Sequence, residues 1–288
     1  MFKDYRIQIY KFIAMKRRIY LLIILMVISF SSFSQTLTKT WTTSEGLKTP
    51  ESVLFDAKSN QIYVSNINGQ PSEKDGNGFI SLLDADGKIN KAQWITGLNA
   101  PKGQAIFNGK LYVADIDELV VISIKEAKII KRYKIKNAKF LNDVTASENG
   151  TIFVSDMQDN KIYALADGQL SLWLEDELLD NPNGLWTENG QLYIGTGQLL
   201  KADLETKKVR VLLEQCGGID GLEKLEDGNF IYSNWQGRVF ITNGEESIQL
   251  LDTVGKQNTA DIDFVPGKNL LLVPTFSGNS IDAYTLKQ

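Results

Sequence analysis

The stretch Asp180–Gly197, DNPNGLWTENGQLYIGTG, has the pattern of a β-hairpin. An apolar strand leads to the dipeptide Asn189-Gly190, and a second apolar strand follows it. Asn-Gly favours a tight hairpin turn because both residues tolerate positive φ. Asn183 does not fit, since it opens the first strand where a packed sheet favours an apolar side chain. The rest of the chain shows whether this amide is an isolated exception.

The second strand of this hairpin recurs along the chain. Each copy joins an apolar run to small or polar residues, and most copies follow a Gly-containing turn. The copies are Ile62–Asn66, Leu111–Asp115, Ile152–Asp156, Leu192–Thr196, Phe230–Asn234 and Leu271–Thr275. Two more strands follow in each unit, such as Arg238–Thr242 and Ser247–Leu251 in the fifth. Four strands in about 40 residues, repeated, predict an all-β, six-bladed β-propeller.

The sixth unit ends after its third strand, Ser280–Leu286. We expect Leu37–Thr43 to supply the missing outer strand, so that the two ends of the chain pair and close the ring. Closure hides sheet edges that would otherwise invite aggregation. The sequence therefore predicts one propeller domain over residues 35–288. The alternative is a chance series of hairpins in a sandwich or a β-helix, which the regular spacing disfavours.

The amino-terminal segment predicts export. The basic run Lys16–Arg18 precedes an apolar run over residues 19–30, and small residues follow. This pattern is typical of a signal peptide, here residues 1–34 cleaved after Ser34, with Met15 as an alternative start. The apolar run is shorter than the ~20 residues that span a bilayer. We expect a periplasmic or secreted protein with no stable membrane anchor once the signal is removed.

Charge and composition exclude several classes of function. The chain carries 31 Lys and Arg and 35 Asp and Glu, and removing residues 1–34 removes six basic residues and one acidic residue, which leaves a net charge of −9. Such a protein is a poor candidate for nucleic-acid binding, but it attracts cations. Histidine is absent, which excludes a Ser-His-Asp triad and a His-ligated zinc. The single cysteine, Cys216, cannot form an internal disulfide, and we expect it to be buried.

Asn183 has a counterpart in every unit, where the innermost strand begins. The set is Glu51, Lys102, Asn142, Asn183, Asp220 and Asp261. Innermost strands line the channel of a propeller, so these side chains should form a ring at one mouth. Carboxylate and amide oxygens suit Ca²⁺, Mg²⁺ or Mn²⁺ better than zinc. The alternative is that polar side chains simply face the water of the channel, with no ligand.

Four short motifs carry a family resemblance. They are PESV at 50–53, FLNDV at 140–144, NPNGLW at 181–186 and GIDGL at 218–222. In order and spacing they resemble the site motifs of the regucalcin/gluconolactonase-like six-bladed propellers, also called the senescence-marker-protein family. Diisopropyl fluorophosphatase and the paraoxonases are more distant relatives. The resemblance covers nearly all of the chain after residue 34.

The resemblance implies roles for particular residues. Glu51, Asn183 and Asp220 match residues that hold a divalent metal in that family. Asn142 matches a residue that contacts the metal or the substrate. Asp220 also matches the family's base or nucleophile. The implied cofactor is one divalent cation, with Ca²⁺ as the first expectation and Mg²⁺, Mn²⁺ or Zn²⁺ as alternatives.

The chain also departs from the family. It has no histidine for a paraoxonase-type pair, and it lacks the Arg-rich blade-two loop expected of a sugar-acid lactonase. Lys102 places a cation in the ring, where it could bind an acidic substrate group or a developing oxyanion, or replace part of the metal's charge. Strictosidine-synthase-like relatives share the fold without being hydrolases, so the fold does not fix the chemistry.

The hypothesis that follows is an exported, monomeric, metal-dependent hydrolase of a small-molecule lactone or other ester. The cation would polarise the carbonyl and lower the pKa of a bound water, or Asp220 would attack directly, while Asn142 and Lys102 bind the substrate. We expect Asp143 and Asp263 either to support the ring residues or to form hydrogen bonds between blades. For Trp235, interblade packing is favoured over a place in the pocket wall. The competing hypothesis is a non-catalytic exported propeller that binds a ligand or partner, with at most a structural cation.

Overall fold

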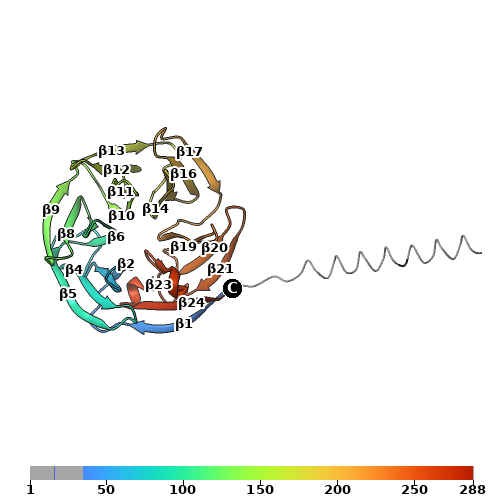
Figure 1. Ribbon diagram of the computed structural model, residues 1–288, viewed down its shortest axis with the longest axis horizontal. Helices are drawn as coiled ribbons and strands as arrows, with labels where there is room; N and C mark the ends of the chain where they lie inside the picture. Colours follow the sequence, from blue (N-terminus) through green and yellow to red (C-terminus); the bar gives the residue numbers. More distant parts are fainter. Residues whose placement is uncertain (1–15, 17–34, 288) are drawn as a thin grey trace, which may run out of the picture. The chain divides into compact units, whose positions relative to one another are not determined.

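Six four-stranded antiparallel sheets form from the repeated units and stand around a central axis (Figure 1). This computed structural model describes Lys16 and residues 35–287. Leu37–Lys287 form one compact unit. The six-bladed, all-β prediction is therefore confirmed.

Each blade runs from the axis outward along the chain. The first blade comprises β2 (Pro50–Asp56), β3 (Gln61–Asn66), β4 (Gly78–Asp84) and β5 (Ile89–Leu98). The second comprises β6 (Pro101–Phe107), β7 (Lys110–Asp115), β8 (Glu118–Ser123) and β9 (Lys128–Lys134). The third comprises β10 (Leu141–Ala146), β11 (Ile152–Asp156), β12 (Lys161–Ala166) and β13 (Gln169–Glu175). The fourth comprises β14 (Leu185–Glu188), β15 (Gln191–Gly195), β16 (Leu199–Asp203) and β17 (Val209–Leu213). The fifth comprises β18 (Leu222–Lys224), β19 (Phe230–Asn234), β20 (Arg238–Thr242) and β21 (Ser247–Asp252). The last comprises β22 (Asp263–Val265), β23 (Leu270–Pro274), β24 (Ile281–Lys287) and β1 (Thr36–Thr43), with 3₁₀ turns at Pro266–Lys268 and Phe276–Gly278.

The ends of the chain close the ring, as the sequence predicted. Strand β1 pairs with β24 as the outer strand of the last blade. Asp282 of β24 fastens the closure with two bonds, from the Lys39 ammonium at 2.7 Å and from the Thr42 hydroxyl at 2.7 Å. The Asp282 side chain is only 2% exposed, so this ion pair is shielded from water on one side. The first and last segments of the domain are thus held in one sheet.

The core lies between blades rather than within them. Each main apolar cluster takes residues from two adjacent sheets; one joins Tyr63 and Leu98 of the first blade to Leu111 and Val120 of the second. The ring of sheets therefore buries its apolar faces only when neighbouring blades stand face to face. Cys216 belongs to another such cluster, is 3% exposed, and burial raises the pKa of its thiol to about 11. The expectation that Cys216 is buried is confirmed.

The hairpin turns follow their residue types. Asn189 and Gly190 have φ of 51° and 70°, as a two-residue turn with two left-handed residues requires. The turn between β22 and β23 is different: the 3₁₀ turn Pro266–Lys268 comes first, and Asn269 takes the left-handed conformation at φ 48°. An asparagine, not a glycine, thus supplies the positive φ in this turn.

The predicted signal peptide, residues 1–34, lies outside the described residues apart from Lys16. Within the described part of the chain, no helix has the length and apolar character that crossing a membrane would need.

Candidate functional site at the mouth of the channel

The ring residues sit at irregularities of the innermost strands. The β2–β3 pairing slips between Pro50 and Ser52, and the β10–β11 pairing slips between Leu141 and Val144. Glu51 lies within the first slip. A bulge of this kind re-aims a side chain that would otherwise follow the strand's alternation. The bulges therefore explain how a polar residue can stand in a packed strand.

Asn183 shows the same irregularity in a stronger form. Strand β14 begins at Leu185, so Asn183 precedes the strand rather than opening it as predicted. Its N–H still bonds to the Gly195 carbonyl at 2.8 Å, which keeps it attached to β15. Asp220 is attached to β19 in the same way, through the Ser233 carbonyl at 2.9 Å. Both residues are held by the sheet without being part of its regular ladder.

In three blades a serine on the second strand accepts a backbone N–H at this irregularity. The Ser155 hydroxyl accepts the N–H of Asp143 at 2.9 Å, and Ser233 accepts the N–H of Gly221 at 2.9 Å. Ser65 does the same for Ser52 at 3.0 Å. A buried N–H without a partner would be costly, so the serine makes the bulge stable. Sequence reasoning counted this serine as part of the repeat and missed its role.

The acidic residue that ends the second strand pins the loop before the ring residue. Asp115 accepts the N–H groups of Asn99 and Ala100, the latter at 2.8 Å, just before β6. Asp156 accepts the N–H groups of Lys139 and Phe140, both at 2.9 Å, just before β10. The path of the chain into the site is therefore fixed by buried carboxylates.

Close approach of neighbouring blades requires glycine after three ring residues, Lys102, Asn183 and Asp220. A Cβ on Gly184 would lie 2.3 Å from the carbonyl oxygen of Asp220, and one on Gly221 would lie 2.2 Å from the backbone nitrogen of Ile262. These contacts involve backbone, which cannot move aside like a flexible side chain. The Asn-Gly and Asp-Gly pairs thus let adjacent blades meet at the axis.

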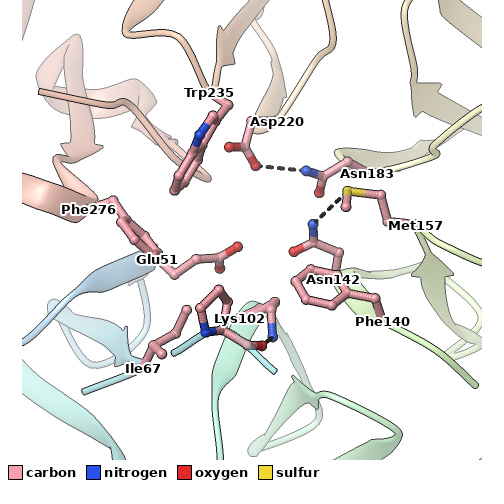
Figure 2. A pocket seen from close by; sticks show the side chains of 11 residues that line it. Glu51, Ile67, Lys102, Phe140, Asn142, Met157, Asn183, Asp220, Trp235 and Phe276 are labelled. Atoms are coloured by element: carbon pink, nitrogen blue, oxygen red, sulfur yellow. Dashed lines mark hydrogen bonds between the residues drawn. The ribbon is translucent and has the colours of Figure 1, made fainter. Parts of the chain in front are cut away.

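Five of the six predicted ring residues converge on one cavity of about 320 Å³ (Figure 2). It is lined by Glu51, Ile67, Pro71, Lys102, Phe140, Asn142, Met157, Asn183, Asp220, Trp235 and Phe276. All four residues with predicted metal roles are in this set. Figure 2 shows the carboxylates of Glu51 and Asp220 and the amides of Asn142 and Asn183 around one central space.

Asp261 is the exception. It lines a different cavity, together with Gln104, Asp143 and Glu223, and its carboxylate accepts the hydroxyl of Ser52 at 2.6 Å. The prediction of a sixth member at the same mouth was therefore wrong. The register of its blade explains this, because the Asp261 backbone pairs with β2 through the Glu51 carbonyl at 2.9 Å rather than lying free at the rim.

The surroundings of Glu51 strongly disfavour the charged form of its carboxylate. Its side chain is 6% exposed, and its Oε2 has no hydrogen-bond partner in the described part of the chain. Burial raises the pKa of Glu51 well above its ordinary value, and the nearby Asp220 carboxylate raises it further. Lys102 acts in the opposite direction but does not cancel these effects. A carboxylate in this state favours either a proton or a bound cation.

Asp220 and the two amides complete the polar group. Asn183 donates from Nδ2 to Asp220 Oδ1 at 2.9 Å. Burial raises the pKa of Asp220 to about 7, although this bond lowers it. Asn142 makes only a weak contact, from Nδ2 to the sulfur of Met157 at 3.5 Å. One amide thus holds a carboxylate in place, and the other is free to exchange its partner for a ligand.

The ammonium of Lys102 is committed largely to the protein. The side chain is 1% exposed, and Nζ donates to the carbonyls of Pro71 and Ala100, both at 2.9 Å. It also lies 4.4 Å from the ring centre of Phe140. Burial lowers the pKa of Lys102 to about 8, with Glu51 opposing the shift. Because an ammonium has three protons, at most one remains for a substrate.

Asp143 and Asp263 form hydrogen bonds between blades, which is one of the two roles expected of them. Asp143 Oδ2 accepts the N–H of Leu185 on the next blade at 2.6 Å, and Asp263 Oδ2 accepts the N–H of Phe55 at 2.5 Å. Trp235 fits both interpretations, since it packs on a residue of the next blade and also lines the cavity. It is 45% exposed and lines the cavity, with its ring edge-to-face against Phe276 at 4.6 Å between centroids.

The oxygen-bearing side chains of the cavity are compatible with a hard cation, but only two of them are carboxylates. Among the described residues, no group of three or more Asp, Glu, His or Cys side chains is arranged to hold a metal ion. A cation at this mouth would rely on two carboxylates and two amide oxygens, which is the chemistry that Ca²⁺ accepts. The unpartnered Oε2 of Glu51 supports that fit.

Comparison with solved structures supports the fold. The chain is similar to streptogramin B lyase, with a TM-score of 0.64 and 13% identity over 88% of this chain and 98% of that one. It is similar to a catalytically inactive histidine-to-alanine variant of virginiamycin B lyase from Staphylococcus aureus with quinupristin, with a TM-score of 0.62 and 12% identity over 88% and 100%. A luciferin-regenerating enzyme gives 0.62 and 15% over 88% and 96%. The sequence matches no protein-family model and no curated protein. At these identities the similarity shows the propeller fold alone.

Proposed function

We propose that this protein is an exported hydrolase of lactones or other esters that uses one divalent cation at the mouth of its channel. The observation that carries the proposal is the convergence of Glu51, Asn142, Asn183 and Asp220 on one cavity, where one buried Glu51 oxygen has no hydrogen-bond partner among the described residues. Four oxygen-bearing side chains from four blades meet there. A packed core has no need of such a group, since each member costs free energy to bury.

Glu51, Asn142, Asn183 and Asp220 would hold the cation. When bound, it would act as a Lewis acid on the substrate carbonyl and would offset the charge of the carboxylates. Ca²⁺ is the first candidate because all four ligands are hard oxygens and none is nitrogen or sulfur. Mg²⁺ and Mn²⁺ share this preference, and Zn²⁺ fits it less well.

Asp220 is the proposed base. Asn183 fixes its Oδ1 by the 2.9 Å bond, which leaves Oδ2 to take a proton from water in the cavity. The water oxygen then forms a bond to the carbonyl carbon, the bond from that carbon to the ester oxygen breaks, and the leaving alkoxide receives the proton from Asp220. Direct attack by the same carboxylate is the alternative route, followed by hydrolysis of the acyl-enzyme.

Asn142 and Lys102 would orient the substrate. The amide of Asn142 can exchange its weak contact with Met157 for a bond to the substrate oxygen. Lys102 has at most one proton left for an oxyanion, since Pro71 and Ala100 take the other two. We therefore assign Lys102 mainly to holding the loop that carries Pro71, and only secondarily to the substrate.

The absence of histidine favours hydrolysis over the chemistry of the similar lyase. A histidine-to-alanine variant of virginiamycin B lyase is described as catalytically inactive, and this chain has no histidine. A lyase mechanism that depends on that side chain has no counterpart here. Membership of the regucalcin/gluconolactonase-like family is part of the proposal and is supported by the four motifs and by the positions of their residues in the cavity.

Turnover of lactones and aryl esters tests the proposal. Purified protein without residues 1–34 is assayed with Ca²⁺, Mn²⁺, Mg²⁺ or Zn²⁺ and with excess chelator, beside Asp220→Asn. The control is Asp86→Asn, which changes a carboxylate that is 91% exposed. Hydrolysis lost with chelator and in Asp220→Asn, but kept in Asp86→Asn, is the expected result. No turnover with any metal, and no effect of chelator on the melting temperature, would favour a non-catalytic binding propeller instead.

A further inference from the structure

The cavity has two chemically distinct levels. The polar residues Glu51, Lys102 and Asn142 are 6%, 1% and 5% exposed, so they form its floor. Several of the apolar lining residues are more exposed and stand nearer the opening, with Trp235 at 45%. Figure 2 shows Trp235, Phe276 and Ile67 on one side of the polar group and Phe140 and Met157 on the other.

The apolar rim is held in place rather than loosely exposed. Trp235 packs edge-to-face on Phe276 at 4.6 Å between ring centres. Asn258 connects the two loops, since its Nδ2 donates to the Trp235 carbonyl at 2.9 Å and its Oδ1 accepts the Ser277 hydroxyl at 2.9 Å. A pre-organised aromatic wall binds with little loss of conformational freedom. A tryptophan that is held in this way and is 45% exposed presents a fixed apolar surface to a ligand.

Among the described residues that line the rim, the indole N–H of Trp235 is the one strong hydrogen-bonding side-chain group, and it can donate but not accept. The lining residues of the rim are Pro71, Phe140, Met157, Trp235 and Phe276, while the apolar Ile67 is 1% exposed and belongs with the buried floor. The one cation of the cavity, Lys102, already donates to two carbonyls. Most sugar hydroxyls placed against such a wall would lose bonds to water without replacement.

We infer that this site takes esters or lactones with an apolar alkyl or aryl substituent close to the ester linkage, as on the γ carbon of a lactone, and that Trp235 and Phe276 select for it over sugar-acid lactones. This inference rests on the proposed hydrolase function for the reacting group, while the selection itself depends only on the rim. The volume of about 320 Å³ lies at the lower end of small-molecule sites. The ligand is therefore a small ester with one ring or a short chain, not a macrocycle.

A homologous series of lactones tests the inference. We measure dissociation constants by calorimetry and kcat/KM by proton release for γ-butyrolactone, γ-hexalactone, γ-octalactone and gluconolactone, each with Ca²⁺ and with chelator. Each methylene buried against the rim is expected to tighten binding about fourfold until the cavity is full. The variants are Trp235→Ala and Phe276→Ala. The control is Leu172→Ala on β13, a large apolar residue that is 47% exposed and outside the cavity.

The expected result is rising affinity and kcat/KM with chain length, with most of that gain lost in Trp235→Ala and kept in Leu172→Ala. Equal affinity across the series, or a preference for gluconolactone, would overturn the inference. Turnover without chain-length dependence would refute the apolar selection and leave the hydrolase proposal standing. Trp235-dependent binding of long lactones without turnover under any metal would refute the hydrolase proposal and leave the selection standing.

Discussion

Gly184→Ala places a methyl group where the neighbouring blade's backbone lies. The new Cβ would be 2.3 Å from the Asp220 carbonyl oxygen and 3.1 Å from the Leu222 Cβ. Both distances are shorter than ordinary contact, and one partner is backbone, so the two blades must separate at the axis. Overpacking of a well-packed contact costs about 1–3 kcal/mol. The shift also moves Asp220 relative to Asn183. In our account these two side chains bind the cation, and Asp220 also acts on the substrate.

Gly197→Ala is the matched control, because it lies in the same blade and its Cβ meets nothing within 4 Å. Chemical and thermal unfolding should show no loss for it, and a gain up to about 1 kcal/mol is expected from a less flexible unfolded chain. For a domain of this size Gly184→Ala should lower the melting temperature by about 2–12 °C, and turnover should fall further than stability explains. If the two variants unfold alike and both retain turnover, the close approach of blades at the hub is refuted.

Three further predictions concern pH, closure and export. Burial raises the pKa of Asp263 to about 7, so its contribution to stability is full below about pH 4 and is lost as the pH rises to 7, by up to about 4 kcal/mol. Asp263→Asn should make the fall in stability between pH 4 and 8 shallower in urea unfolding, while the other buried carboxylates such as Asp143 and Asp220 keep part of it, and an unchanged slope would contradict the assignment. Asp282→Ala removes the bond to Lys39 that joins β1 to β24 and should lower the free energy of unfolding by about 1–3 kcal/mol. Asp86→Ala at an exposed ion pair should lower it by under about 1 kcal/mol. Equal losses in the two variants would count against an ion pair shielded from water at the closure. In a secreting host the mature protein should begin at Gln35 by mass spectrometry, and an intact leader on exported protein would refute the predicted cleavage after residue 34.

The repeat and its turns were accessible from sequence because they depend on local chemistry. Asn189-Gly190 requires two residues at positive φ, and the structure gives 51° and 70°. Closure followed from counting strands, since a blade of three strands leaves an edge that the free segment before β2 can cover. The convergence of Glu51, Asn183 and Asp220 followed from their equal place in each unit.

The remaining features depend on long-range geometry that one sequence does not encode visibly. Strand alternation does not reveal a bulge, so the role of Ser155 in satisfying the N–H of Asp143 could not be anticipated. Asp261 matches the other ring residues in sequence, yet its pairing with β2 turns it to another cavity. Trp235 reaches the mouth because Phe276, from a different blade, supports it, and a contact between such distant loops leaves no local pattern.

The central claim is that four side chains at the channel mouth bind one divalent cation. Calorimetric titration of chelator-treated protein with Ca²⁺ tests it most directly, beside Glu51→Gln and the exposed control Asp86→Asn. The account predicts one site per chain in the unaltered protein and in Asp86→Asn, with affinity lost or greatly weakened in Glu51→Gln. Binding of equal strength in Glu51→Gln, or no binding of Ca²⁺, Mg²⁺ or Mn²⁺ by the unaltered protein, would contradict it.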